Sequence, residues 1–362
     1  MKKTMEDYIR ETSRVLKDNL KKTENILSGL IDELAKEQFE KIMIVASGSS
    51  YNAAICAEDF MQSYFGKKIE IKTPFSFFHY EVIDSSYAYL FVSQSGSSTN
   101  IIDALKKCKT AGRKTIAIVG NKKCTMGKIA DRVFEYGVGE EKVGYVTKGM
   151  STLTLFFMMF AMECSKKRVF GKALLKDIDK LCEEDKRELD IAVENYYKVY
   201  EYAQQFCDDN KKSLLSMKHV FFLSCGANRG TIREAALKVA EMVHVQTNEY
   251  EVEEFLHGPD LQLTPEYTLF FVDAGGETSK RIKEIFEASK EVTDHTYCLS
   301  EGNMSLEHTK EKISPIYFTA FFQYLAYYVA KELNIMTEHP LFSQFEDKVF
   351  CKTEDYVEDM PF

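Results

Sequence analysis

The stretch Phe91-Val-Ser-Gln-Ser-Gly-Ser-Ser-Thr-Asn-Ile-Ile-Asp-Ala-Leu105 decides the fold that we expect for this chain. The apolar run that leads into it, residues 87–92, is typical of a buried strand. A helical pattern begins at Ile101, Ile102 and Leu105, directly after a loop of small polar residues. Because the first turn of a helix presents unpaired N–H groups and the positive end of its dipole, this arrangement is able to hold an anion.

The loop itself favours a phosphate monoester over a nucleotide. Gly96 lets the backbone come close to a ligand, and hydroxyls are offered by Ser93, Ser95, Ser97, Ser98 and Thr99. The loop contains neither a lysine nor the Gly-x-x-x-x-Gly-Lys pattern of a nucleotide-binding P-loop. The alternative is an ordinary strand-to-helix turn capped by a serine, and the loop alone does not separate the two.

Strands and helices alternate along the chain. Apolar runs predict strands at residues 41–46, 68–72, 115–119 and 132–136, and again at 220–224 and 267–272, with helical patterns between them. This alternation predicts an α/β protein with parallel sheets covered by helices on both faces. The loop that follows the first strand is 47–52 in the first half and 225–230 in the second, with helices expected from about residues 53 and 231.

The pattern also suggests a tandem duplication. Gly48 and Gly226 are 178 residues apart, and Gly96 and Gly276 are 180 apart. Nearly equal offsets indicate two copies of one unit, although two glycine loops could align by chance. In the second copy Asp273 and Glu277 replace hydroxyls, and a carboxylate repels a phosphate. We therefore expect the first copy to bind the anion and the second to have another role.

Composition narrows the class of protein. A length of 362 residues suggests about two domains, and a net charge of −9 argues against wrapping nucleic acid. Nine scattered cysteines without a C-x-x-C pair indicate reduced intracellular thiols and no zinc site. No signal peptide is visible, and the apolar stretches 152–162 and 316–330 are interpreted as buried helices. We expect a cytoplasmic protein with no metal, no cofactor, no membrane contact and no nucleic-acid partner.

One helix of the second copy carries candidate chemistry. Glu234, Lys238 and Glu241 are spaced i, i+4, i+7, so they lie on one helical face among small apolar residues. Buried, such a carboxylate and amine could move a proton beside a carbonyl group. The alternative is a common solvent-facing Glu–Lys pair. His257, directly before Gly258-Pro259, ends a segment at a turn and is either structural or catalytic.

These motifs together resemble a known family. The chain is similar to tandem sugar isomerase (SIS) domain proteins, namely the isomerase half of glucosamine-6-phosphate synthase and its shorter relatives. Residues 93–98 (Ser-Gln-Ser-Gly-Ser-Ser) resemble the family's S-Q-S-G-E-T loop, and residues 46–50 resemble its first loop. Residues 141–148 are similar to the segment ending in S-T-K. Residues 234–241 resemble E-G-A-L-K-L-K-E, and residues 253–259 resemble G-E-x-x-H-G-P. The resemblance covers roughly residues 38 to 335.

The resemblance implies a fold and the boundaries of its domains. It implies two tandem SIS domains, each a flavodoxin-like parallel sheet flanked by helices in three layers. We expect an N-terminal helical segment at 1–37, the phosphate-binding domain at 38–175, and a helical linker at 176–215. The domain with the proton-transfer residues would follow at 216–335, and a C-terminal tail at 336–362.

The resemblance also implies roles for individual residues. The sugar phosphate would be held by Ser93, Gln94, Ser95 and Ser98, helped by Ser49 and Ser50. In the second domain, Glu241 would shuttle a proton between C1 and C2 of the open sugar, with Lys238 beside it and Glu234 positioning. His257, donated by the neighbouring subunit, would open the sugar ring, which makes a homodimer an expectation.

Two departures limit the choice of reaction. The chain begins with a short helical segment where the synthase has a glutaminase domain, so we do not expect glutamine-dependent synthesis. The family's Schiff-base lysine follows a P-R-N-L-A-K pattern, and here Lys348 lies three residues too far from Pro340 to match it. We rank an isomerase or deaminase of a 6-phosphorylated amino sugar first and a deglycase of phosphorylated fructosyl amino acids second. A non-catalytic sugar-phosphate-binding protein is the third hypothesis.

Overall fold

The computed structural model describes residues 3–66, 69–142, 144–169, 177–335, 342–346, 348–349, 351–354 and 356. The chain divides into two compact units. The first unit comprises Arg14–Asp185 and Glu338–Pro361, and the second comprises Met1–Ser13 and Lys186–Thr337. The predicted boundary between residues 175 and 176, and most of the predicted tail, lie outside the described residues. The predicted domain limits therefore stay predictions.

Five parallel strands form the sheet of the first unit, in the order β2-β1-β3-β4-β5. Their bounds are β1 Lys41–Ala46, β2 Ile69–Lys72, β3 Tyr87–Ser93, β4 Thr115–Val119 and β5 Arg132–Glu135. All five strands were predicted, although Lys68, the predicted start of β2, lies outside the described residues. Every residue of β3 is buried, as expected for a strand in the middle of a sheet covered on both faces.

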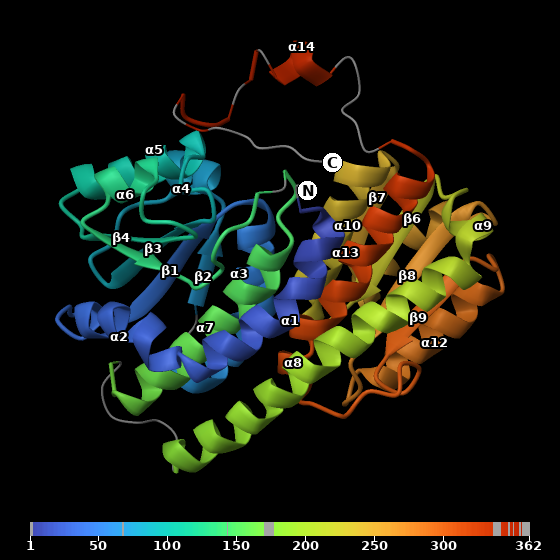
Figure 1. Cartoon of the computed structure of the whole chain (residues 1–362), viewed down its shortest axis with the longest axis horizontal. Helices are drawn as coiled ribbons and strands as arrows, with labels where there is room; N and C mark the ends of the chain where they lie inside the picture. Colours follow the sequence, from blue (N-terminus) through green and yellow to red (C-terminus); the bar gives the residue numbers. More distant parts are fainter. Residues whose placement is uncertain are drawn as a thin grey trace. The chain divides into compact units, whose positions relative to one another are not determined.

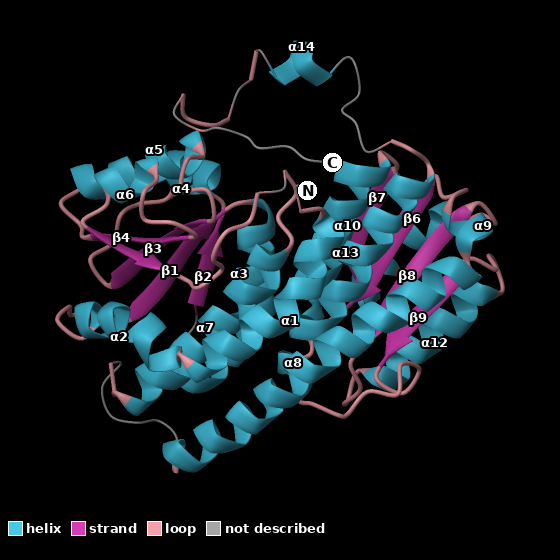
Figure 2. Cartoon of the chain, viewed as in Figure 1, coloured by secondary structure: helices cyan, strands magenta, loops and turns pink. Residues whose placement is uncertain are grey.

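Helices flank this sheet, as Figures 1 and 2 show. On one face, Phe77 of α4 and Leu105 of α5 pack against Tyr89 and Phe91 of β3. Helix α3 packs against α7, and α7 is buried over most of its length, which confirms the buried helix predicted at 152–162. The helices of the first unit are α2 Thr23–Leu34, α3 Gly48–Phe65, α4 Pro74–Tyr80, α5 Thr99–Thr110, α6 Thr125–Ile129, α7 Lys148–Lys166 and, in the tail, α14 Phe342–Glu346.

Four parallel strands form the sheet of the second unit, in the order β7-β6-β8-β9. Their bounds are β6 His219–Ser224, β7 Gln246–Glu251, β8 Tyr267–Asp273 and β9 Thr296–Ser300. This order repeats β2-β1-β3-β4 of the first sheet. The starts of β1 and β6 are 178 residues apart and those of β3 and β8 are 180 apart, as the two glycine loops predicted. The α/β fold with two parallel sheets is confirmed.

The helices of the second unit include α13, which is buried from Pro315 to Ala330 and packs against α10. This confirms the buried helix predicted at 316–330. The other helical elements are α9 Lys211–Leu214, α10 Asn228–Val243, α11 Val252–Phe255, η1 Pro259–Gln262, α12 Ser279–Lys290, η2 Glu311–Ile313 and α13 Pro315–Glu332. Two further helices, α1 Met5–Lys21 and α8 Ile178–Asp209, contain the boundaries between the units.

Two helix starts differ from the sequence prediction. Helix α3 begins at Gly48, not near residue 53, and α10 begins at Asn228, not at Thr231. The reason is that Gly48 and Gly226 adopt left-handed conformations, with φ of 54° and 55°. A single glycine in this conformation turns the chain sharply enough for the helix to begin almost at once. Ser49 and Ser50 therefore lie in the first turn of α3 and not in a loop.

Candidate active site

The loop between β3 and α5 is held in one shape by its own serines. The Gly96 N–H donates to Ser93 Oγ at 3.1 Å, and the Ser97 N–H donates to Ser95 Oγ at 3.3 Å. Gly96 itself has a φ of 62°, in the left-handed region that favours glycine. Ser93 and Ser97 are buried, whereas Ser95 and Ser98 are partly exposed at the start of α5. The hydroxyls of Ser95 and Ser98 are thus more accessible to a ligand than those of Ser93 and Ser97.

The first loop lies at the same edge of the sheet. Strands β1 and β3 are parallel neighbours, with Ala46 paired to Val92, so both strands end side by side. The Asn100 side chain donates from Nδ2 to Ser47 Oγ at 3.2 Å and so connects the two helix starts. Ser49 and Ser50 are buried in the first turn of α3, with exposed fractions of 6% and 9%. Two helix N-termini therefore meet at this edge, where the predicted phosphate residues lie.

Gln94 is directed into the protein. Its Nε2 donates to the Glu141 carboxylate at 2.5 Å, and its main-chain oxygen accepts from the Gly120 N–H. A Cβ on Gly149 would lie 1.8 Å from Gln94 Oε1, so the glycine makes room for this amide. Gln94 is predicted to hold the phosphate. Its side chain here instead braces the loop, through Glu141, against the start of α7.

Glu141 acts as the cap of helix α7. Its carboxylate accepts from the main-chain N–H groups of Thr147, Lys148 and Gly149 at 3.1, 2.6 and 3.0 Å. Burial raises the pKa of Glu141 above its usual value, against the opposing effect of these hydrogen bonds. The side chain of Lys148 is buried as well and donates to the Glu140 carbonyl at 2.9 Å. The segment that resembles the family's S-T-K motif thus supports the loop between β3 and α5 through the contact of Glu141 with Gln94.

The C-terminal tail reaches the loop at Lys352. Its Nζ lies 3.1 Å from Ser98 Oγ and 3.4 Å from Ser95 Oγ. Lys348, the predicted C-terminal lysine, is exposed, and its main-chain N–H donates to the Phe345 carbonyl. The role of Lys348 stays a prediction. Sequence reasoning missed Lys352 because Cys-Lys-Thr matches no motif and the tail carries no periodic pattern.

In the second unit, α10 brings Glu234, Lys238 and Glu241 together. Lys238 Nζ lies 2.6 Å from Glu241 Oε2 and 3.6 Å from Glu234 Oε1. The side chains of Glu234 and Lys238 are 1% and 2% exposed, whereas that of Glu241 is 33% exposed. The alternative of a solvent-facing Glu–Lys pair is therefore wrong. A buried ammonium is neutralised by two carboxylates, and one of these carboxylates is open to a reactant.

His257 lies on a different element from this cluster. It follows α11 in the turn before η1, as predicted, and its side chain is exposed. Its main-chain N–H donates to the Glu254 carbonyl at 3.2 Å, and Gly258 continues the turn with a φ of 128°. The exposed ring is available to a second molecule, which agrees with the role that the resemblance implies.

The loop between β8 and α12 carries its own negative charge. Asp273 is buried, and its carboxylate accepts from the Gly275 N–H at 2.9 Å and from Ser279 Oγ at 2.7 Å. Asp273 stands where the first copy has Ser93, and its carboxylate binds the first residue of α12. Both loops thus bind one of their own main-chain N–H groups through a side-chain oxygen, and the second loop does so with a carboxylate.

Glu311 adds a second carboxylate to these loops. A Cβ on Gly226 would lie 2.5 Å from Glu311 Oε1, and a Cβ on Gly276 would lie 3.4 Å from Oε2. Glu311 therefore approaches both glycine turns of the second unit. Ser314 Oγ donates to the Glu311 carbonyl at 2.7 Å and also accepts from Asn228 Nδ2, which holds the segment against the start of α10.

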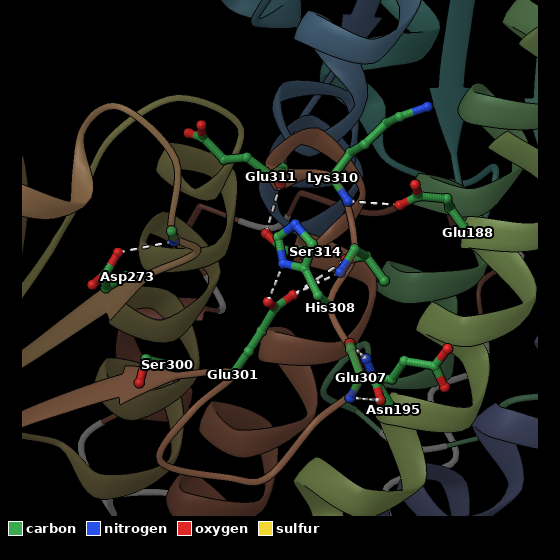
Figure 3. A network of polar contacts seen from close by, with 12 residues as sticks. Glu188, Asn195, Asp273, Ser300, Glu301, Glu307, His308, Lys310, Glu311 and Ser314 are labelled. Atoms are coloured by element: carbon green, nitrogen blue, oxygen red, sulfur yellow. Dashed lines mark hydrogen bonds and ion pairs between the residues drawn. The ribbon is translucent and has the colours of Figure 1, made fainter. Parts of the chain in front are cut away.

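Further polar contacts fix the segment that presents Glu311, as Figure 3 shows. The carboxylate of Glu301 contacts His308 Nδ1 at 2.7 Å and accepts from the Thr309 N–H at 3.1 Å. The Lys310 N–H donates to Glu188 at 2.7 Å. Because this segment is held from several sides, two acidic groups stand at the loops of the second unit, where a phosphate would be repelled.

Comparisons with known proteins agree with this architecture. Residues 33–163 match the family model described as the SIS domain. The chain is 27% identical over 334 residues to the isomerizing glutamine–fructose-6-phosphate aminotransferase of Thermococcus kodakarensis, covering 89% of this chain and 54% of that protein. The chain thus spans about half the length of the curated relatives that it matches.

Solved structures share the fold along nearly the whole chain. A candidate phosphosugar isomerase from Clostridium difficile 630 superposes with a TM-score of 0.82 at 22% identity, covering 97% of this chain and 99% of that one. The glucosamine-6-phosphate deaminase of Thermotoga maritima gives a TM-score of 0.67 at 18% identity, covering 89% and 95%. These likenesses match the two sheets to the fold of two SIS domains.

The described part of the chain has neither a membrane-spanning helix nor a cluster of metal ligands. No helix there is long and apolar enough to cross a membrane. Among the same residues, no group of three or more histidine, cysteine, aspartate or glutamate side chains is placed to hold a metal ion.

Proposed function

We propose that the chain is a phosphosugar isomerase or deaminase acting on a 6-phosphorylated amino sugar, since residues 33–163 match the SIS domain model. With glucosamine 6-phosphate, a proton would leave C2 of the open-chain aldose and return at C1. The resulting imine at C2 would take up water and release ammonia, leaving fructose 6-phosphate. The named deaminase and aminotransferase among the similar proteins handle substrates of this class.

The buried cluster on α10 carries this proposal. A binding protein has no need to bury Lys238 and Glu234 beside Glu241, because removing two charged groups from water is costly. A proton-transfer enzyme does need it. The ammonium of Lys238 holds the Glu241 carboxylate at 2.6 Å and leaves its other oxygen free. Glu241 is partly exposed, so it is able to reach the carbon acid of a bound sugar.

The loop of the first unit would hold the phosphate. Ser95 and Ser98 offer partly exposed hydroxyls, and the start of α3 lies at the same sheet edge with the positive end of its helix dipole. Ser93 and Gln94 would act by holding the loop in shape. Ser49 and Ser50 would complete the site from the first turn of α3.

His257 would open the sugar ring of a substrate bound to a neighbouring subunit. Its exposed position on the turn after α11 leaves the imidazole free to act on another copy of the chain. An imidazole titrates near neutral pH, so it is able to give and take the proton that ring opening requires. This role requires a homodimer in which both subunits contribute to each site.

Substitution of Glu241 tests the proposal. Glu241→Gln keeps the shape of the side chain but removes the base, so turnover should fall about 10²- to 10⁴-fold. The variant should still fold and bind the sugar phosphate, because the buried pair of Lys238 and Glu234 remains. Exchange of the C2 proton with solvent deuterium, followed by NMR, measures the step directly. Glu254→Gln, an exposed glutamate on α11, is the matched control.

The same assay distinguishes the three hypotheses for function. Ammonia released from glucosamine 6-phosphate supports the deaminase. A free amino acid released from a 6-phosphorylated fructosyl amino acid supports the deglycase instead. Binding of either compound without any proton exchange in the wild-type protein would overturn the proposal in favour of a sugar-phosphate-binding protein.

A further inference from the structure

The tail pairs with the phosphate loop as a short antiparallel segment. Lys352 forms a β-bridge with Ser98. On one side of the bridge, the Thr99 N–H donates to the Cys351 carbonyl at 2.9 Å, and on the other, the Thr353 N–H donates to the Ser97 carbonyl at 2.9 Å. Residues 351–353 therefore follow the loop closely where α5 begins.

Side chains strengthen this pairing. Thr99 Oγ1 donates to the Cys351 carbonyl at 3.2 Å, and Thr353 Oγ1 lies 3.2 Å from Thr125 Oγ1 at the start of α6. The tail is thus bonded to two helix starts of the same unit. Contacts on both flanks of Lys352 limit how far its side chain is able to move from the loop.

The Lys352 amine lies where it could form an ion pair with an anion bound at the loop. Its Nζ lies 3.1 and 3.4 Å from Ser98 Oγ and Ser95 Oγ, the two exposed hydroxyls of the loop. The side chain also passes over the Tyr356 ring, with Nζ 5.0 Å from the ring centroid. An anion that accepts hydrogen bonds from both serines would lie within reach of the same ammonium group.

The positive charge of Lys352 matters because the loop beside it has no charge of its own. The loop at residues 93–100 contains no lysine or arginine, and its serines are neutral donors. A phosphate monoester carries nearly two negative charges at neutral pH, and a charge-assisted hydrogen bond is stronger than a neutral one. A neutral loop alone would bind phosphate weakly, whereas a loop with Lys352 beside it supplies the missing charge.

We propose that Lys352 completes the phosphate site, so that residues 351–353 act as a clasp that binds the phosphate of the substrate from the C-terminal tail. The tail lysine would serve the phosphate end of the sugar and not its carbonyl end. This inference rests on the proposed function for the identity of the substrate. It extends that function by naming a binding residue outside the motifs that resemble the family.

Calorimetric titration of the full chain tests the clasp. The probes are inorganic phosphate, fructose 6-phosphate and unphosphorylated fructose. Lys352→Met should weaken binding of both phosphate-bearing probes about 10- to 100-fold and leave fructose unaffected. Lys352→Arg should retain most of the affinity because it keeps the charge. Lys106→Met, which removes an exposed lysine from α5 of the same unit, is the matched control and should change affinity less than about twofold.

Each outcome decides between the hypotheses. Equal affinities of Lys352→Met and wild type for phosphate and fructose 6-phosphate would overturn the clasp and leave the proposed function standing. Tighter binding by Lys352→Met would show that the lysine blocks the loop, which also overturns it. If wild type binds neither phosphate-bearing probe, both the clasp and the proposed function fail.

Discussion

Several charged side chains of this protein are buried. Lys238, Glu234 and Asp273 are all buried, and each has opposite charge or hydrogen-bond donors within reach. Such groups are costly when unpaired, so each has a structural or chemical role. Lys238 and Glu234 serve the proposed proton transfer. Asp273 holds the loop between β8 and α12 through hydrogen bonds from Gly275 and Ser279.

Glu33 shows the structural role of a buried charge. On α2, its carboxylate lies 2.5 Å from Lys114 Nζ and 3.1 Å from Arg132 Nε, beside the starts of β4 and β5. The hydrogen bond from Lys114, helped by Arg132, lowers the pKa of Glu33 from 4.5 to about 2. A lowered pKa means that the carboxylate stabilises the fold above pH 4.5 and loses this effect as the pH falls towards 2.

We therefore expect Glu33→Gln to lower the free energy of unfolding by about 1 to 2 kcal/mol at pH 7, since both partners are partly exposed to solvent. The difference from wild type should shrink when urea denaturation is repeated near pH 3. Glu24→Gln, an exposed position on the same helix, should have no effect. A difference for Glu33→Gln that is constant between pH 3 and pH 7 would contradict the ion-pair account.

At the scale of elements, the phosphate loop depends on a close approach to α6. The Met126 N–H donates to the Gly96 carbonyl at 2.9 Å. A Cβ built on Gly96 would lie 2.2 Å from Cys124 Sγ and 2.8 Å from Cys124 Cβ. Gly96 is thus required both for its left-handed backbone and for the space that it leaves to the neighbouring helix start.

This geometry predicts that Gly96→Ala costs more than backbone strain alone. The strain of a positive φ is about 1 to 2 kcal/mol, and overpacking against Cys124 should add about 1 to 3 kcal/mol. Gly112→Ala isolates the first effect, because Gly112 has a φ of 72° and open space around it. Urea denaturation of both variants measures the difference, and equal losses of stability would disprove the role of the close contact.

Sequence patterns predicted the central strands of both sheets, and the two strands that they missed are edge strands with little burial. Strands β3 and β8 are continuous apolar runs in the middle of their sheets, so both were predicted. The edge strand β7, Gln-Thr-Asn-Glu-Tyr-Glu, is half exposed and polar, and its β pairing depends on its neighbour β6. Strand β9 was missed for the same reason, with only Thr296 and Leu299 buried.

The residues of the candidate site could likewise be predicted only in part from the sequence. Helical spacing placed Glu234, Lys238 and Glu241 on one face, but spacing is the same for a buried and an exposed face. Burial of that face depends on the packing of α10 against α13, which lies about 80 residues further along the chain. Lys352 could not be predicted at all, because its position depends on hydrogen bonds to a loop some 250 residues earlier.

At the scale of the whole molecule, two copies of one fold have diverged in chemistry. Each unit has parallel strands in the same order and glycine turns at the same two places. In the first unit, partly exposed hydroxyls lie at the second of those turns. In the second, Asp273 and Glu311 bring negative charge to the corresponding region, and the proposed proton-transfer residues lie further along α10. Under the proposed function, duplication would allow binding and proton transfer to change independently.

The proposed dimer predicts that two inactive variants restore each other. In a mixed dimer of Glu241→Gln and His257→Ala chains, one of the two sites combines an intact Glu241 with an intact His257. Co-expression with random pairing should therefore give about a quarter of wild-type turnover. Turnover of the co-expressed mixture measures this recovery. Different tags on the two chains allow the mixed dimer to be purified, and its turnover should be about half of wild type.

The control for this experiment pairs Glu241→Gln with Lys238→Met. Both positions lie on α10 of the same chain, so no mixed dimer contains an intact site and no activity should return. If the Glu241→Gln and His257→Ala mixture also stays inactive, His257 does not act across subunits.

The tail that contacts the loop between β3 and α5 also contains a cysteine that a reagent is able to label selectively. Seven of the nine cysteines are buried, Cys298 is half-buried, and Cys351 is exposed. Burial raises the pKa of Cys108 and Cys298 to about 12, which keeps these thiols protonated and slow to react. A thiol-reactive dye would therefore attach first at Cys351, the first residue of the clasp, and would report on the surroundings of that segment in the unmodified sequence.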